Sequence, residues 1–203
     1  EISACLVGSE MCIRDRNRST PLEVQEMQLR SSDCKGFLIF GVEMQREDLQ
    51  VFIDTGLPFV VLDNSFQDSD VDSVSINNFQ GISKAMQYAY DMGHREIGYI
   101  RCRERITSFS ERYQAYKNCM KKFGLKIKES YIWDVNYSEK TIREEVGKYL
   151  SENNENPTIF IAENDFIACH AIHGMQDNGY RVPEDISVIG FDDRPVCQMI
   201  VPS

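Results

Sequence analysis

The feature that most constrains the fold is a regular alternation between short apolar runs and amphipathic stretches of about 10–15 residues. The apolar runs predict strands at 36–41, 58–63, 71–76, 96–100, 131–135, 158–162 and 186–191. The amphipathic stretches predict helices at 21–32, 46–56, 77–93, 110–124, 138–153 and 164–178. Strands and helices that alternate in this way form right-handed βαβ units. The sequence therefore predicts an α/β fold with mainly parallel sheets flanked by helices.

Glycine marks the places where several of these helices are expected to end. Gly56, Gly93 and Gly124 close their predicted helices and Gly179 directly follows one, at the position where a left-handed residue commonly terminates a helix. Ser138 stands where a side-chain hydroxyl can cap the first turn of the next helix.

Ligands bind to parallel sheets outside the carboxyl ends of the strands, so we expect functional residues just after each strand. Asp63 and Asp192 each end an apolar strand. Such a carboxylate could be a general acid or base, a Mg²⁺ ligand, an acceptor for sugar hydroxyls, or only a cap for the following loop. Arg112 lies near the start of a helix, where its guanidinium could bind a hydroxyl pair, a carboxylate or a phosphate, or remain solvated.

Composition excludes several classes of function. The 203 residues are 42% hydrophobic and 27% charged, as in ordinary globular proteins, and no apolar stretch approaches the roughly 20 residues that span a bilayer. A net charge of −10 argues against direct binding of nucleic acid by this chain. The sequence also shows no export signal, so we expect a cytoplasmic protein without membrane contact.

Motifs for catalysis or cofactor binding are missing from the sequence. It contains no GxGxxG, no phosphate-binding loop and no GxSxG. The seven cysteines are odd in number and form no CxxC, so we expect reduced thiols. His170 and His173 share a helix but lack further ligands, and His94 is expected to hydrogen-bond a turn. We therefore expect no metal, no cofactor and no enzymatic activity.

The first 16 residues, "EISACLVGSEMCIRDR", do not fit the pattern that follows. They lead into no strand or helix pattern that connects to the next segment. The string resembles translated sequencing-adapter read-through, and we exclude it from fold prediction as a non-native segment.

Eight short motifs follow one another from residue 17 onward. They are "KGFLIFG", "PFVVLDN", "VDSVSINNFQG", "MGHREIGYI", "SERYQAYKNCMKKFGL", "AENDFIACHAI", "GYRVPEDISVIGFDD" and the terminal "VPS". In this order and spacing they resemble the effector-binding domain of the LacI/GalR family of bacterial transcriptional regulators. The resemblance implies the two-lobed fold of periplasmic binding proteins. Residues 17–76 would form part of the N-terminal lobe, 77–192 the C-terminal lobe, and 193–203 the start of the return crossing.

The resemblance also implies which residues contact the ligand. The expected set is Asp63, Asn64, Ser108, Phe109, Arg112, Tyr137, Asn164 and Asp192. Arg112 matches the principal effector-binding arginine, although Ala115 replaces the glycine usual three residues later. Tyr137 matches an aromatic residue that stacks on the ligand, with Trp133 as a competing candidate.

The family pattern implies an allosteric function. A small sugar-like or nucleoside-like effector would bind between the lobes and change the affinity of a separate helix-turn-helix domain for operator DNA, in a homodimer. The alternatives are a solute-binding protein of an ABC sugar uptake system with the same fold, and a hydrolase that uses Asp63 and Asp192. No nucleophile, phosphate loop or metal cluster accompanies those two carboxylates, which disfavours the hydrolase.

Overall fold

The computed structural model describes residues 2–7, 10–15, 35–66, 69–153 and 155–201. The chain divides into two compact units, residues 1–76 with 106–108, and residues 77–105 with 109–203. The predicted helix at 21–32 lies outside the described residues.

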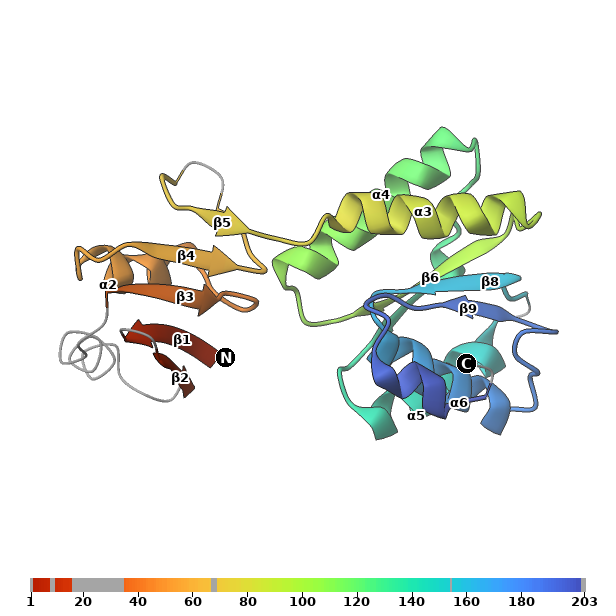
Figure 1. Ribbon diagram of the computed structural model, residues 1–203. Coiled ribbons are helices and arrows are strands. Elements are labelled where there is room, and N and C mark those ends of the chain that lie inside the picture. The colour runs from red at the N-terminus through yellow and green to blue at the C-terminus, as the bar shows by residue number, and fades with distance from the viewer. Residues whose placement is uncertain (1, 8–9, 16–34, 67–68, 154, 202–203) are drawn as a thin grey trace. The chain divides into compact units, whose positions relative to one another are not determined.

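The first unit contains a five-stranded sheet in the order β2-β1-β3-β4-β5 (Figure 1). Its strands are β1 (Ile2–Val7), β2 (Glu10–Asp15), β3 (Gly36–Phe40), β4 (Phe59–Leu62) and β5 (Ser73–Val74). Strands β3, β4 and β5 are parallel, as predicted, whereas β1 runs antiparallel to both β2 and β3. The segment excluded from fold prediction therefore includes two paired strands.

A small apolar core packs β3 and β4 against the helical segment that connects them. The predicted helix at 46–56 is shorter in the structure, a 3₁₀ turn η1 (Arg46–Asp48) followed by α2 (Leu49–Ile53). Phe52 of α2 meets Phe37 of β3 edge to face, with ring centroids 5.8 Å apart. The buried side chains of this core are Phe37, Ile39, Met44, Leu49, Phe52 and Val61.

The second unit is built on a parallel four-stranded sheet in the order β7-β6-β8-β9. Its strands are β6 (Ile97–Cys102), β7 (Ile132–Val135), β8 (Ile159–Ala162) and β9 (Ser187–Ile189). Its helices are α3 (Asn78–Asp91), α4 (Thr107–Lys122), α5 (Glu139–Glu152) and α6 (Asp165–Asp177), with short 3₁₀ turns η2 (Glu129–Tyr131) and η3 (Pro195–Met199). All four predicted strands and all four predicted helices of this region are present, and the periplasmic-binding-protein-like fold is confirmed.

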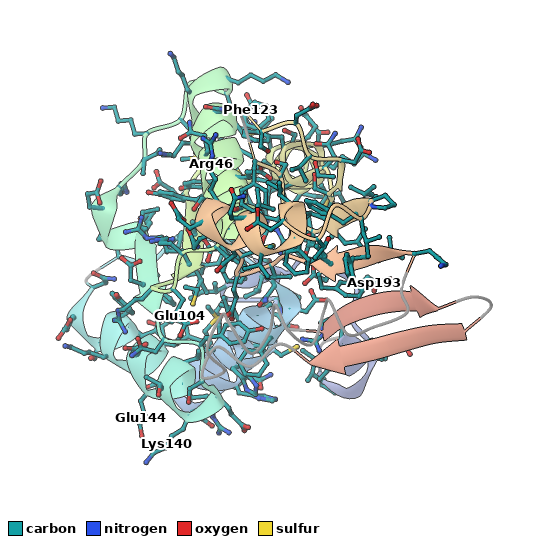
Figure 2. The ribbon with its side chains drawn as sticks, turned by 90° about the vertical axis from the view of Figure 1, so that its left-hand side faces the viewer. Arg46, Glu104, Phe123, Lys140, Glu144 and Asp193 are labelled. Atoms are coloured by element: carbon teal, nitrogen blue, oxygen red, sulfur yellow. The ribbon has the colours of Figure 1, made fainter. Side chains whose placement is uncertain are left out.

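Two helices cover each face of the second sheet (Figure 1). Helices α3 and α4 pack on one face, where Ile82, Met86, Tyr116 and Met120 meet inward side chains such as Tyr99. Helices α5 and α6 cover the other face. The outer side of α5 carries solvated ion pairs such as Lys140–Glu144 (Figure 2). This burial of both faces explains why the strands are continuous apolar runs in the sequence.

One glycine in this sheet is required by close packing. A Cβ atom on Gly98 of β6 would lie 2.4 Å from the ring of Phe160 on β8. Phe160 itself packs against Trp133 of β7, with ring centroids 4.0 Å apart. The packing of Phe160 and Trp133 therefore depends on the absence of a side chain at position 98.

Among the described residues, no helix has the length and apolar character that would let it span a membrane. The four cysteines whose side chains the structure describes have free thiols, and they are Cys102, Cys119, Cys169 and Cys197.

Candidate functional site

Arg112 is the centre of the polar residues at the carboxyl edge of the second sheet. Its side chain projects from the first half of α4 and the residue is only 3% exposed. The guanidinium donates from Nε to Oδ1 of Asn78 at 2.8 Å and from Nη1 to the carbonyl oxygen of Glu163 at 2.6 Å. A buried guanidinium that is held in one orientation presents its remaining donors in a fixed direction, which suits recognition of a small polar ligand.

The third contact of Arg112 is Asp192, which follows β9. Nη2 lies 3.3 Å from Oδ1 of Asp192, and the guanidinium carbon lies 3.8 Å above the ring centroid of Phe191. Asp192 and Asp193 both have positive φ, at 104° and 53°. Such backbone strain in non-glycine residues is common at functional sites, where the surrounding structure holds it in place.

Asn164 links the same edge to Tyr137. Its Oδ1 accepts from the N–H of Ile167 and caps α6, while its Nδ2 donates to the hydroxyl of Tyr137 at 3.1 Å. Tyr137 is 40% exposed, and its ring centroid lies 4.6 Å from that of Phe166 and 6.5 Å from that of Phe109. An exposed aromatic face beside fixed polar groups is well suited to stacking on a sugar or a base.

Trp133 does not share this exposure. Its side chain is fully buried, stacks on Tyr149 at 5.4 Å and donates from Nε1 to the carbonyl oxygen of Ser130 at 3.2 Å. Trp133 is therefore a core residue, and of the two aromatic candidates only Tyr137 is available to a ligand.

Glu163 lies between Ala162 of β8 and Asn164, at a strand end where functional residues are expected, but it is not among the expected ligand contacts. Its side chain is 0% exposed, and its Oε2 accepts from the N–H of Cys102 at 2.5 Å. Burial raises the pKa of this carboxyl to about 8, against the opposing effect of that N–H and of nearby arginines. A glutamate directly after an apolar strand was the only signal in the sequence, and it did not reveal the burial of the carboxyl group.

Arginines from the end of β6 surround this carboxyl. Arg101 forms a bidentate ion pair with Asp134, at 2.5 and 2.7 Å, and Arg103 pairs with Glu145. Arg105 lies 3.7 Å from Oε1 of Glu163, while the neighbouring Glu104 is exposed (Figure 2). This edge of the sheet is therefore rich in guanidinium groups, although the chain as a whole is acidic.

The first unit holds the other two predicted contacts. Asp63 directly follows β4 with φ at 61°, and its N–H donates to the carbonyl oxygen of Val74 at 2.8 Å. Asn64 is buried, and its Nδ2 donates to the carbonyl oxygens of Gly41 and Met44 at 2.7 and 3.0 Å. The amide of Asn64 therefore stabilises a loop of its own unit.

The structure thus brings together Phe109, Arg112, Tyr137, Asn164 and Asp192 in the second unit. Ser108 is buried in the first turn of α4.

The histidines have other surroundings. His94 interacts with the hydroxyl of Thr158 at 2.7 Å, and His170 packs on Phe166. Among the described residues, no three His, Cys, Asp or Glu side chains are grouped so that they could hold a metal ion.

Comparisons with known proteins agree with this architecture. The family model for the periplasmic binding protein-like domain matches residues 86–203, more than half of the chain. The transcriptional repressor PurR of Actinobacillus pleuropneumoniae is 30% identical over 158 residues, which cover 78% of this chain and 47% of the repressor. The chain spans about half the length of the curated relatives it matches.

Solved structures show the same likeness. A regulatory protein of the LacI family from Chloroflexus aggregans superposes with a TM-score of 0.82 at 26% identity, covering 93% of this chain and 67% of that one. A sugar-binding transcriptional regulator of the LacI family from Escherichia coli, complexed with phosphate, gives 0.77 at 26% identity, covering 89% and 65%. The chain therefore belongs to the periplasmic binding protein-like domain family, in the form found in LacI-family transcriptional regulators.

Proposed function

We propose that this chain is the effector-sensing part of a transcriptional regulator that binds a small hydroxyl-rich metabolite. The observation that carries the proposal is the buried, oriented guanidinium of Arg112, with Tyr137, Asn164 and Asp192 beside it. Two polar side chains and an arginine next to an exposed ring form a set that fixes the orientation of a sugar or nucleoside. Asp63, at a strand end of the first unit, is expected to supply a further contact.

The effector would control binding of operator DNA by a helix-turn-helix domain outside this sequence. The control is allosteric, because the effector shifts an equilibrium between lobe arrangements by its difference in affinity for them. We expect a cytoplasmic homodimer without catalytic turnover, and the acidic character of this chain is compatible with a separate basic DNA-binding module.

A solute-binding protein of an uptake system is the second candidate, since it would have the same fold. The relatives named above are regulators, which favours the transcriptional regulator over the solute-binding protein. The coding sequence upstream separates the two directly. A helix-turn-helix supports the regulator, and a signal peptide or lipoprotein signal contradicts it.

A thermal-shift screen of sugars, sugar phosphates and purines tests the ligand site. A ligand at 100 times its Kd stabilises the folded state by about 2.7 kcal/mol, or roughly 5–10 °C for a chain of this size. Arg112→Ala and Asp192→Asn should abolish the shift given by the hit. Arg143→Ala is the matched control, because Arg143 pairs with Asp177 at 2.7 Å in an exposed ion pair on the helices.

Two results would contradict the assignment. The first is an unchanged shift in both site variants. The second is turnover of the hit, which would indicate an enzyme. Arg112 is buried, so its removal can destabilise the fold. If Arg112→Ala does not fold, the ligand-induced thermal shift of Asp192→Asn tests the site assignment.

A further inference from the structure

The arginines at the carboxyl edge of the second sheet do not all have acidic partners of their own. Arg101 has Asp134, Arg103 has Glu145, and Arg112 has Asp192. Arg105 reaches only 3.4 Å from Oδ1 of Asp134, an atom that already accepts from Arg101. Within the described part of this edge, Arg105 is therefore the arginine whose charge is least compensated.

The other acidic neighbour of Arg105 is Glu163, at 3.7 Å. Burial favours the neutral form of this carboxyl, and its pKa of about 8 lies above neutrality. With Glu163 protonated, the carboxylate that remains paired with Arg105 among the described residues is Asp134, which it shares with Arg101.

Arg105 is also accessible to a ligand. Its side chain is 41% exposed, unlike the nearly buried Arg112. Both arginines contact Glu163, since Arg105 approaches its carboxyl group and Arg112 donates to its carbonyl oxygen. A ligand held by Arg112 is therefore within reach of the guanidinium of Arg105.

The carboxyl group of Glu163 has spare hydrogen-bonding capacity. Oε2 accepts from Cys102, but Oε1 is buried without a hydrogen-bond partner among the described residues. The ionisable groups that act on it are Tyr99, Arg101 and Cys102 of β6, Arg105 of the following loop, and Arg112 of α4. Of these, Arg105 combines the greatest exposure with the longest ion pairs, so it is the group that can turn to a ligand.

We propose that Arg105 receives an anionic group of the effector, a phosphate or a carboxylate, and that at alkaline pH, where Glu163 is ionised in the free protein, this carboxyl takes up a proton from solvent as Arg105 turns away from it. This inference rests on the proposed function and narrows its ligand to an acidic metabolite. The planar guanidinium matches two oxygens of either anion. When the anion neutralises Arg105, Glu163 loses a charge that favours its ionised form and binds a proton.

Minimal anions test the first part without knowledge of the whole effector. Inorganic phosphate and sulfate are titrated at millimolar concentration and constant ionic strength, with glucuronate added to represent carboxylates and glucose as the neutral probe. We expect saturable thermal shifts with the anions and none with glucose. Arg105→Gln should weaken anion binding by about 10- to 100-fold.

Arg103→Gln is the matched control, because it removes an equal charge from a neighbouring exposed arginine that has its own partner. It should leave anion binding within about twofold of the wild type. Equal losses in both variants would mean nonspecific attraction and would overturn the inference. The absence of any saturable anion shift would overturn it as well. Relative responses to phosphate, sulfate and glucuronate then identify the kind of anion that the site prefers.

Sulfate tests the proton uptake, because it does not titrate near neutrality. Its affinity should rise several-fold from about pH 9 to about pH 7 as Glu163 becomes protonated. Glu163→Gln should bind sulfate with no such pH dependence. A pH dependence that persists in Glu163→Gln would refute the role of Glu163.

The two proposals can fail separately. A neutral sugar that binds through Arg112 and Asp192, with equal affinity in Arg105→Gln, would leave the proposed function intact and overturn only the anionic effector. Loss of every ligand response in the wild type would overturn both.

Discussion

Replacing Glu163 with glutamine should make the second unit more stable at alkaline pH. Glutamine keeps the shape of the side chain and an oxygen that can accept from Cys102, but it cannot ionise. In the wild type, the pKa of Glu163 is raised by burial, so folding favours the protonated form. Stability from this group is therefore complete below the unfolded pKa and is lost as the pH rises through the folded value.

The size of the effect follows from the raised pKa. The pKa rises from 4.5 to about 8, and each tenfold change in proton affinity corresponds to about 1.4 kcal/mol. Between about pH 5 and pH 8 the free energy of unfolding should fall by about 1.4 kcal/mol per pH unit relative to Glu163→Gln. The limit at higher pH is about 5 kcal/mol, an upper bound because water and local relaxation reduce such costs.

Urea unfolding at a series of pH values measures this difference. Trp133 is the single tryptophan and is fully buried in β7, so its fluorescence reports on the second unit. Glu104→Gln is the control, because Glu104 is an exposed carboxylate of the same segment and should leave the pH slope unchanged. Parallel pH profiles for the wild type and Glu163→Gln would refute the reasoning.

Three further substitutions have definite expected outcomes. Asn64→Ala removes two hydrogen bonds to loop carbonyls and should destabilise the first unit by about 1–3 kcal/mol, measured by hydrogen exchange of that loop. Gly98→Ala forces a methyl group against Phe160 and should cost about 1–3 kcal/mol, seen as a lower urea midpoint. Tyr137→Phe removes the hydroxyl that Asn164 contacts. It should change stability by less than about 1 kcal/mol but reduce the effector thermal shift. A wild-type exchange rate in Asn64→Ala, a wild-type urea midpoint in Gly98→Ala, or a wild-type thermal shift in Tyr137→Phe would contradict these expectations.

The elements of the second unit could be predicted because their signals are local. Helical periodicity placed Ile82, Met86, Tyr116 and Met120 on inward faces, and the glycine stops coincide with residues of positive φ such as Gly93. Strand β9 is shorter than the run 186–191. Phe191 leaves the sheet, and its ring packs beside Arg112. No local pattern shows that a strand will end because its last aromatic side chain has a tertiary partner.

The first unit and the site were harder to predict because they depend on contacts that no local pattern reveals. Strand β5 is only two residues long, and both are exposed, so burial contributes little to its definition. The buried amide of Asn64 and the core position of Trp133 depend on residues that are distant in the sequence. The raised pKa of Glu163 likewise arises from burial of its carboxyl group, which exists only in the folded chain.

The contacts of Arg112 limit how the specificity of this domain can be redesigned. A guanidinium has five N–H donors, and Asn78, the carbonyl of Glu163 and Asp192 take one each, which leaves two for a ligand. The three partners follow or begin different elements, so the same side chain joins α3, β8 and β9 at their ends. Lysine has neither the donors nor the planar geometry to replace it. New ligand preferences are therefore most accessible through the exposed residues Tyr137 and Arg105, whose substitution leaves the contacts of Arg112 in place.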